Sequence, residues 1–528
     1  MFNASPAAAP TASDSTSASW LADFVAGLLV FMLALPLSLG IAKASGFPAA
    51  MGVLTAMVGG MVTCLFRVSA LTIKGPAAGL ITVCAAAVTE FGGPDAGWKV
   101  ACGAIVVMAA LQVLFGFLKF GTLSDFFPHS AVHGMLAAIG IIIIAKQIPV
   151  LLGVEHSMYA GEGPIQLLLD IPRFVQNERT HTAIVGLTGL AIVFTLPLIR
   201  IKLMKKVPGP LVVLAVTIPM SIAWSFRDTE KPWSLVQIGD FWGSVGVNAD
   251  FSQIATFPFW KYVFMFLFVS SLESLLTVKA IDNLAPWKRT SDYNGELKGQ
   301  GAGNALAGLL GGLPMISEVV RSSANVTFGA RTKLSNFFHG TFLLLAMLLP
   351  IPYIEMIPNA ALAAMLIFAG YRLAAPKEFI HTYHIEREQL AIFIATIVVT
   401  LWHDLLMGVA AGIVVKLVFH LWNGAQLQSL FKADYKVERE GDVHRVVMGG
   451  SAVFTNLIAY KKLFASLPEG AKVRLDLRRT LLIDHSFNAF IEHHMKQYNE
   501  RGGDMRIVGD EKHIPLSQHP LATRKLVI

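Results

Sequence analysis

Charged residues are scarce in this chain, and cysteines are scarcer still. Asp, Glu, Lys and Arg make up 15% of its 528 residues, whereas a soluble globular protein usually has about 25%. The three cysteines, Cys64, Cys84 and Cys102, lie in or beside apolar stretches. They therefore predict neither a disulfide framework nor a metal cluster. Basic and aromatic residues are not interleaved in one patch, so the net charge of +7 does not indicate a nucleic-acid partner.

The beginning of the chain lacks the features of a secretory signal. Residues 1–20 are rich in Ala, Ser and Thr, and Asp14 is their one charged residue. Because this stretch has no basic n-region, we expect it to be a disordered N-terminal tail on the cytoplasmic side.

Long apolar runs fill most of the remaining sequence. Hydrophobic residues make up 54% of the chain, and its mean hydropathy is +0.59. This composition predicts a polytopic α-helical membrane protein with about fourteen spans, several of them shorter than the roughly 20 residues of a full crossing. The expected spans are Leu21–Ala44, Phe47–Phe66, Pro76–Val88, Val100–Leu118, Val132–Leu152, Ala183–Leu198, Val207–Ser225, Phe257–Ala280, Ala302–Leu313, Met315–Phe328, Phe337–Pro350, Ala360–Leu373, Ala391–Trp402 and Leu405–Trp422.

The distribution of Lys and Arg sets the expected orientation. The loop Arg200–Lys206 carries four basic residues and no acid, whereas acids outnumber bases in the loop Arg227–Asp250. The positive-inside rule places the first of these loops in the cytoplasm, and counting spans from there places both termini in the cytoplasm. We therefore expect a multi-pass protein of the inner (plasma) membrane.

The last part of the sequence is polar and has a different periodicity. Val443–Met448, Lys472–Leu477 and Met505–Val508 have the pattern of strands, and Ser486–Tyr498 has the pattern of a helix. We expect residues 435–528 to form a small soluble α/β domain in the cytoplasm, after a membrane domain at residues 21–425.

Two of the expected spans are interrupted, one in each half of the chain. Gly75-Pro76 precedes the third span, and Gly312–Pro314 precedes the tenth, which carries Glu318 and Arg321. A charge at bilayer depth costs roughly 2.5–3.5 kcal/mol, so it usually faces a partner, a cavity or a substrate. Paired interrupted spans indicate a transporter's binding site, and helix N-termini at the two breaks would suit an anion. The alternative is that small residues at the breaks only permit close helix packing.

Six segments of the chain resemble the SulP family of anion permeases, in the family's order. They are LALPLSLGIA (Leu33–Ala42), TIKGPAAG (Thr72–Gly79), HSAVHGMLAAIGIII (His129–Ile143), SSLESLLTVKAID (Ser270–Asp282), GQGAGNALAGLLGGLP (Gly299–Pro314) and RSSANVTFGARTKLS (Arg321–Ser335). The segment Val473–Gly509 resembles a STAS domain. The resemblance implies a seven-plus-seven inverted repeat divided into a core and a gate, with the anion held between the half-helices of spans three and ten.

The resemblance also implies which residues line the anion site. In the third span they are Gly75, Pro76, Ala77 and Ala78, and in the first span Leu37. Animal members of the family often have Phe at the position of Ala77, and several members have a Gln at the position of Leu37, so the resemblance implies a less polar wall here.

In the tenth span, Arg321 matches an arginine that some members of the family place beside the anion. Ser322 would add a hydroxyl donor, and Val320 stands where some members have Ser. An ion pair between Arg321 and Glu318, three residues apart on one helix, is the alternative role for the arginine.

Glu273, in the middle of the eighth span, is the expected coupling residue. Its position matches a carboxylate that the family keeps there. A single carboxyl group removed from water tends to bind a proton, so a co-transported proton is favoured over sodium. The alternative is a fixed ion pair with Lys279 or Arg321. We expect no metal site and no other cofactor, because His129 and His133 have no third ligand.

The sequence therefore predicts a secondary active transporter of a small inorganic or dicarboxylic anion, and no enzyme. Sulfate or bicarbonate is favoured, with proton-coupled symport and an elevator-type movement in a homodimer. A sodium-coupled bicarbonate symporter, an anion exchanger and a channel remain open. A membrane scaffold that signals through the STAS-like domain is an alternative of another class. In that domain, His485 interrupts the turn that is phosphorylated in related proteins, so we do not expect phosphorylation at Ser486.

Overall fold

The structure of the chain is a computed structural model that forms two compact units. One consists of Met1–Gly121 and Ile139–Leu373, and the other of Thr122–Ala138 and Ala374–Ile528. The predicted boundary between membrane and soluble domains, at residues 425–435, falls inside the second unit. Most of the predicted N-terminal tail and the loop Arg200–Lys206 lie outside the described residues. The described residues are 16–122, 128–159, 162–198, 209–229, 234–236, 241–284, 291–348, 355–403, 405–468 and 470–527.

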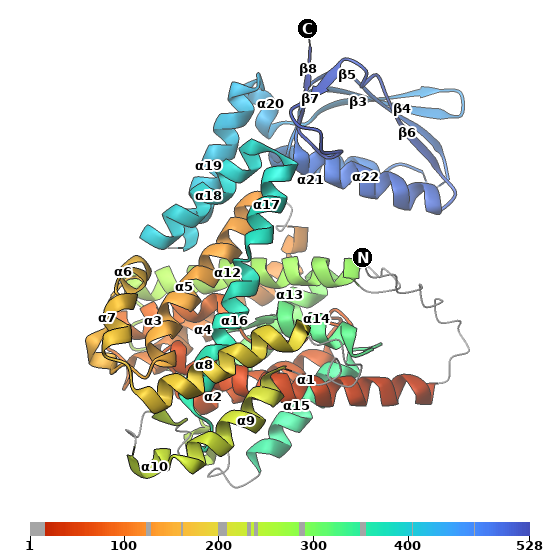
Figure 1. Cartoon of the computed structure of the whole chain (residues 1–528). Helices are drawn as coiled ribbons and strands as arrows, with labels where there is room; N and C mark the ends of the chain where they lie inside the picture. Colours follow the sequence, from red (N-terminus) through yellow and green to blue (C-terminus); the bar gives the residue numbers. More distant parts are fainter. Residues whose placement is uncertain are drawn as a thin grey trace. The chain divides into compact units, whose positions relative to one another are not determined.

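The first unit is helical, and its longer helices coincide with the predicted spans (Figure 1). They are α1 (Thr16–Ala44), α2 (Ala49–Val62), α3 (Ile81–Glu90), α4 (Gly97–Phe117), α5 (His129–Leu151, which begins in the second unit), α8 (Thr180–Thr195), α9 (Gly209–Ala223), α12 (Phe257–Leu284), α13 (Tyr293–Leu310), α14 (Val319–Thr327), α15 (Leu334–Met347) and α16 (Asn359–Leu373). Among the described residues, six helices are long and apolar enough to cross a membrane.

The connections between these helices contain short helices that the sequence did not predict. They are α6 (Pro164–Leu169), α7 (Ile171–Gln176), α10 (Phe226–Thr229) and α11 (Phe241–Ser244). Glycine allows the long helices to pack closely. A Cβ on Gly60 of α2 would lie 2.6 Å from the Cα of Gly340 in α15.

Helix α13 begins earlier than the sequence predicts, at Tyr293 instead of Ala302. Asp292 caps its start by accepting hydrogen bonds from the backbone N–H groups of Asn294 and Gly295. The first half of this helix is polar, and its polar side chains are buried, so hydropathy alone assigned it to a loop.

The third and tenth spans begin later than predicted. The residues after the two breaks were expected to start helices, with Pro tolerated in the first turn. Instead Lys74–Pro76 forms a strand, β1, and Met315–Ser317 forms a second strand, β2. A 3₁₀ turn at Ala78–Leu80 then leads into α3, and Glu318 leads into α14. The prediction that a helix starts at Gly75-Pro76 was therefore wrong, because residues 74–76 are extended and pair with residues 315–317.

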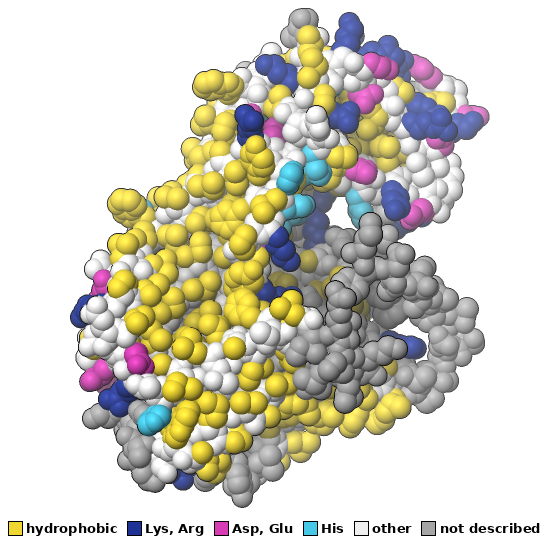
Figure 2. Space-filling view, viewed as in Figure 1, with side chains coloured by type: hydrophobic (Ala, Val, Ile, Leu, Met, Phe, Trp, Pro, Cys, Tyr) yellow, Lys and Arg dark blue, Asp and Glu magenta, His cyan; other side chains and the backbone are white. Residues whose placement is uncertain are grey.

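The second unit contains helices and a mixed sheet. Its helices α18 (Arg387–Trp402) and α19 (Leu405–Trp422) coincide with the last two predicted spans, and α17 (Pro376–Ile385) and α20 (Leu427–Phe431) flank them. Figure 2 shows hydrophobic side chains over much of the helical surface, and charged side chains gathered over the strands of this unit. This contrast agrees with a membrane-embedded helical part and a soluble sheet.

The sheet is centred on β5 (Lys472–Ile483). This strand pairs in parallel with β4 (Val443–Ala452) and β6 (Asp504–Val508), and its end pairs antiparallel with β8 (Arg524–Leu526). The edge strands are β3 (Asp434–Glu440) and β7 (His513–Pro515), in the order β3-β4-β5-β8-β7.

Two helices, α21 (Leu457–Ala465) and α22 (His485–Glu500), contribute apolar side chains to the core of this sheet. The predicted strands and the predicted helix α22 are confirmed. Strand β3 was missed because it is mostly exposed and lacks alternation.

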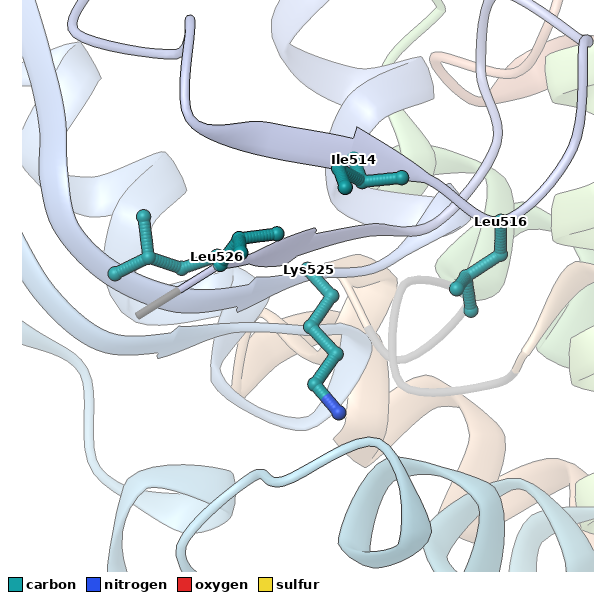
Figure 3. A pocket seen from close by; sticks show the side chains of 5 residues that line it. Ile514, Leu516, Lys525 and Leu526 are labelled. Atoms are coloured by element: carbon teal, nitrogen blue, oxygen red, sulfur yellow. The ribbon is translucent and has the colours of Figure 1, made fainter.

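A surface pocket of about 410 Å³ lies on the outer strands of this sheet (Figure 3). Apolar side chains form its wall, and the amine of Lys525 is its charged group. The residues that line it are Ile514, Leu516, Lys525, Leu526 and Val527. None of the predicted anion-site residues is among them.

Asp484 connects the sheet domain to α19 within the second unit. It caps α22 by accepting from the backbone N–H of Phe487 at 2.7 Å. Its Oδ2 atom lies 3.0 Å from Nζ of Lys416 and 3.6 Å from Nε2 of His420, both on α19. The side chains of Lys416 and Asp484 are 1% and 0% exposed. Nζ of Lys416 also donates to Oγ of Ser486 at 3.0 Å.

These contacts set the protonation of Asp484. Burial favours its neutral form, but the charges of Lys416 and His420 and the N–H of Phe487 outweigh burial and hold the pKa of the Asp484 carboxyl below its usual range. A depressed folded-state pKa stabilises the fold above the unfolded value of about 3.9, and this stabilisation is lost as pH falls through the folded value.

We predict that Lys416→Met destabilises the second unit by about 3–5 kcal/mol, because it leaves a buried carboxylate without its counter-charge. Thermal unfolding in detergent, followed by circular dichroism, measures this loss at neutral pH. The exposed Lys432 provides the matched control, since Lys432→Met removes the same charge outside this cluster. Equal unfolding temperatures for the two variants would contradict the prediction.

Candidate functional site

The two interrupted spans meet in a short antiparallel ribbon. Strand β1 pairs with β2 in the register Lys74 with Ser317, Gly75 with Ile316 and Pro76 with Met315. Both strands are completely buried. Because the strands run in opposite directions, the chain leaves the ribbon toward α3 at one end and toward α14 at the other.

Polar side chains from the surrounding helices satisfy the backbone of this ribbon. Oδ1 of Asn304 accepts from the N–H of Met315 at 2.7 Å, and Nε2 of Gln300 donates to the carbonyl of Met315 at 2.6 Å. Oδ1 of Asn336 accepts from the N–H of Lys74 at 3.1 Å. Such partners are required because water and lipid cannot serve this buried backbone.

A buried ion pair lies beside the ribbon. Nζ of Lys74 is 3.0 Å from Oε1 of Glu296, and both side chains are 0% exposed. The same carboxylate accepts from the hydroxyl of Ser317 at 2.5 Å and from the N–H of Ser69 at 2.8 Å. Sequence reasoning missed Glu296. The spacing of Glu296, Gln300 and Asn304, four residues apart in each case, is the signal that places all three on one face of α13.

The guanidinium of Arg321 lies against the ribbon. It is 0% exposed, and none of its three guanidinium nitrogens has a hydrogen-bond partner in the described part of the chain. A Cβ on Gly75 would collide with its Nη1 atom, so the guanidinium abuts β1. The alternative of an ion pair with Glu318 is not formed. Glu318 instead caps α14, accepting from the backbone N–H of Arg321 at 2.7 Å.

Glu273 of α12 approaches the start of α3. A Cβ on Gly79 would collide with its carboxyl group, and the residue is 6% exposed. Its Oε2 atom has no hydrogen-bond partner among the described residues, and the same holds for Oγ1 of Thr277, one turn further along α12. The alternative of a fixed ion pair with Lys279 or Arg321 is not formed within 4 Å in the described residues.

The remaining predicted residues lie around the same two breaks. Ser322 accepts from the N–H of Ile73 at 2.9 Å and so also holds the strand. Ala77 is 2% exposed and Leu37, on α1, is 7% exposed. The side chain of Ala78 lies outside the described part of the structure.

Val320 faces a different space from Arg321. It lines a cavity of about 190 Å³ whose lining residues include neither Arg321 nor Glu273. The lining residues are Leu33, Val320, Ser323, Ala324, Thr327, Phe328 and Arg372.

His129 and His133 stack at 4.4 Å between ring centroids. Within the described ranges, no group of three His, Cys, Asp or Glu residues could hold a metal ion.

Comparison with known proteins assigns the family. Residues 20–396 match the model of the Sulfate permease family. YvdB of Bacillus subtilis (strain 168), whose name assigns it provisionally to sulfate transport, is 27% identical over 74% of this chain and 71% of its own length. The bicarbonate transporter BicA of Picosynechococcus sp. (strain ATCC 27264 / PCC 7002 / PR-6) is 26% identical over 75% of this chain and 69% of its own.

Two solved structures share the fold. The transmembrane domain of a cyanobacterium bicarbonate transporter BicA matches with a TM-score of 0.65 at 26% identity, over 74% of this chain and 97% of that one. The structure of SLC26A9 matches with a TM-score of 0.67 at 15% identity, over 94% of this chain and 85% of that one, and it supports the fold alone.

These matches confirm a multi-pass helical membrane protein followed by a domain whose sheet fits the STAS-like prediction. The family and these relatives are transporters and not enzymes, as the sequence predicts. The family model covers most of the helical part of the chain. The chain therefore belongs to the sulfate permease family.

Proposed function

We propose that this protein is a secondary active transporter of a small inorganic or dicarboxylic anion, with sulfate or bicarbonate favoured. The observation that carries the proposal is the guanidinium of Arg321, which is fully buried and lacks a hydrogen-bond partner among the described residues. A buried charged group whose hydrogen-bond donors have no partners is costly. An anion beside Gly75 would supply both the counter-charge and the acceptors that a guanidinium needs.

The surroundings of Arg321 support an anion in that position. Gly75 has no side chain and Ala77 a small one, so a small ligand can approach the backbone after β1. The hydroxyl oxygen of Ser322 accepts from Ile73, and its own proton remains to be donated to a ligand. The family description and the names of the relatives favour sulfate and bicarbonate; chloride, nitrate and dicarboxylates are the alternatives.

Glu273 is the proposed coupling residue. Its carboxyl group is buried, and burial disfavours the charged form of a carboxyl group, which favours a co-transported proton. A sodium ion would need several hard oxygen ligands. Ser274, a neighbouring hydroxyl, already accepts from the N–H of Ser317 at 3.1 Å, which leaves Thr277 as the free hydroxyl beside Glu273. Proton coupling is therefore preferred to sodium coupling.

The antiparallel ribbon supports an inverted repeat, because two spans related by a twofold axis in the membrane plane meet head to head. On this basis we propose an elevator-type movement of a core, in a homodimer of the inner (plasma) membrane with both termini in the cytoplasm. An exchanger or channel would use the same anion site. A membrane scaffold that signals through the STAS-like domain would not need an anion site.

We predict that Arg321→Ala lowers anion affinity by at least about tenfold, since a hydrogen bond to a charged group contributes roughly 1.5–3 kcal/mol. Calorimetry in detergent with sulfate and with bicarbonate measures the affinity. Gly75→Ala should also weaken binding, because its Cβ displaces the guanidinium. Arg173, which is 49% exposed on α7, provides the control variant Arg173→Ala. A folded Arg321→Ala protein with wild-type affinity would refute the proposed role.

We predict that Glu273→Gln abolishes pH-driven accumulation of the anion while preserving its binding. The amide has the shape of the protonated acid but cannot release a proton. Uptake into proteoliposomes should rise for the wild type as external pH falls, and the variant should support exchange at most. Glu90→Gln, at an acid 37% exposed at the end of α3, is the matched control. Accumulation by the wild type that needs sodium and ignores pH would contradict proton coupling.

A further inference from the structure

His339 is another buried side chain of the first unit whose polar atoms have no hydrogen-bond partner among the described residues. It lies on the buried face of α15 and is 0% exposed. Neither Nδ1 nor Nε2 has a hydrogen-bond partner among the described residues. A neutral imidazole has one N–H donor and one acceptor nitrogen, and leaving both unsatisfied in a dry interior costs free energy. A ligand that accepts a hydrogen bond from the imidazole N–H would remove part of this cost.

The helix that carries His339 is fixed against the same ribbon as Arg321. Asn336, one turn earlier on α15, accepts from the N–H of Lys74. Gly75, the next residue of β1, abuts the guanidinium of Arg321. Arg321 and the helix that carries His339 thus both contact β1.

Close packing keeps the surroundings of His339 dry. A Cβ on Gly27 of α1 would lie 3.1 Å from the backbone nitrogen of His339, and α2 packs against α15 at Gly60. The α2 segment, Ala49–Val62, contains no charged residue.

Three other charged side chains of the first unit, Asp23, Lys74 and Glu318, have partners in the described residues. Asp23 of α1 accepts from the N–H groups of Arg331 and Thr332, before α15 begins. Lys74 is paired with Glu296. Glu318 caps α14. The guanidinium of Arg321, by contrast, has no hydrogen-bond partner among the described residues.

We propose that His339 donates a hydrogen bond to the transported anion and thereby helps to determine which anions bind. The proposal rests on the anion site proposed above. A cation is disfavoured there by the positive charge of the buried guanidinium. An oxyanion has several acceptor oxygens, so one oxygen can accept from Arg321 and another from the imidazole N–H.

The test compares His339→Ala and His339→Gln with wild type by calorimetry, using sulfate, bicarbonate and chloride. His339→Ala should weaken oxyanion binding by about tenfold, the loss expected for one hydrogen bond. His339→Gln, which keeps a donor, should retain most of the affinity. Thr341→Ala is the control on α15, because Thr341 is solvent- or lipid-facing and donates to the carbonyl of its own helix at Phe337.

The outcomes separate this inference from the proposed function. If Arg321→Ala loses binding and folded His339→Ala does not, the role of His339 is refuted and the anion site stands. If wild type binds none of the anions, the proposed function itself fails. If neither His339 variant yields folded protein, His339 is a packing residue and the inference is overturned. A drop in thermal stability with unchanged affinities for all three anions also overturns it.

Discussion

The pairing of Lys74–Pro76 with Met315–Ser317 is the contact on which the rest of the first unit depends. It joins two segments far apart in the sequence and fixes where α3 and α14 begin. A strand pair inside a membrane protein is possible only if its backbone groups are satisfied by protein. The amides of Gln300, Asn304 and Asn336 meet this requirement, and their positions explain why α13 and α15 carry polar residues on buried faces.

Charge is distributed unequally around this ribbon. On one side, Lys74 and Glu296 neutralise each other and share further hydrogen bonds with Ser317 and Ser69. On the other, the guanidinium of Arg321 is buried without a hydrogen-bond partner among the described residues. The paired charges hold the ribbon in place. In the proposed function, an anion supplies the hydrogen-bond acceptors that the Arg321 guanidinium lacks.

Hydropathy predicted the helices because lipid requires long apolar runs. The breaks at Gly75-Pro76 and Gly312–Pro314 pointed to the candidate site because they interrupt such runs. The pairing of β1 with β2 was not predicted, since three-residue strands have no period that a sequence can reveal. Glu296 and His339 were missed because the sequence does not show which side chains surround them in the folded protein. The polar start of α13 was assigned to a loop because burial of polar residues depends on partners elsewhere in the chain.

The central claim is that an anion binds beside Gly75 and Arg321, at the junction of the two interrupted spans. Crystals grown with selenate, an oxyanion of the shape of sulfate, would locate the bound anion by the anomalous signal of selenium. The account predicts a peak within hydrogen-bonding distance of the Arg321 guanidinium and close to β1. A fully occupied selenate elsewhere in the first unit, with Arg321 still unpartnered, would contradict it.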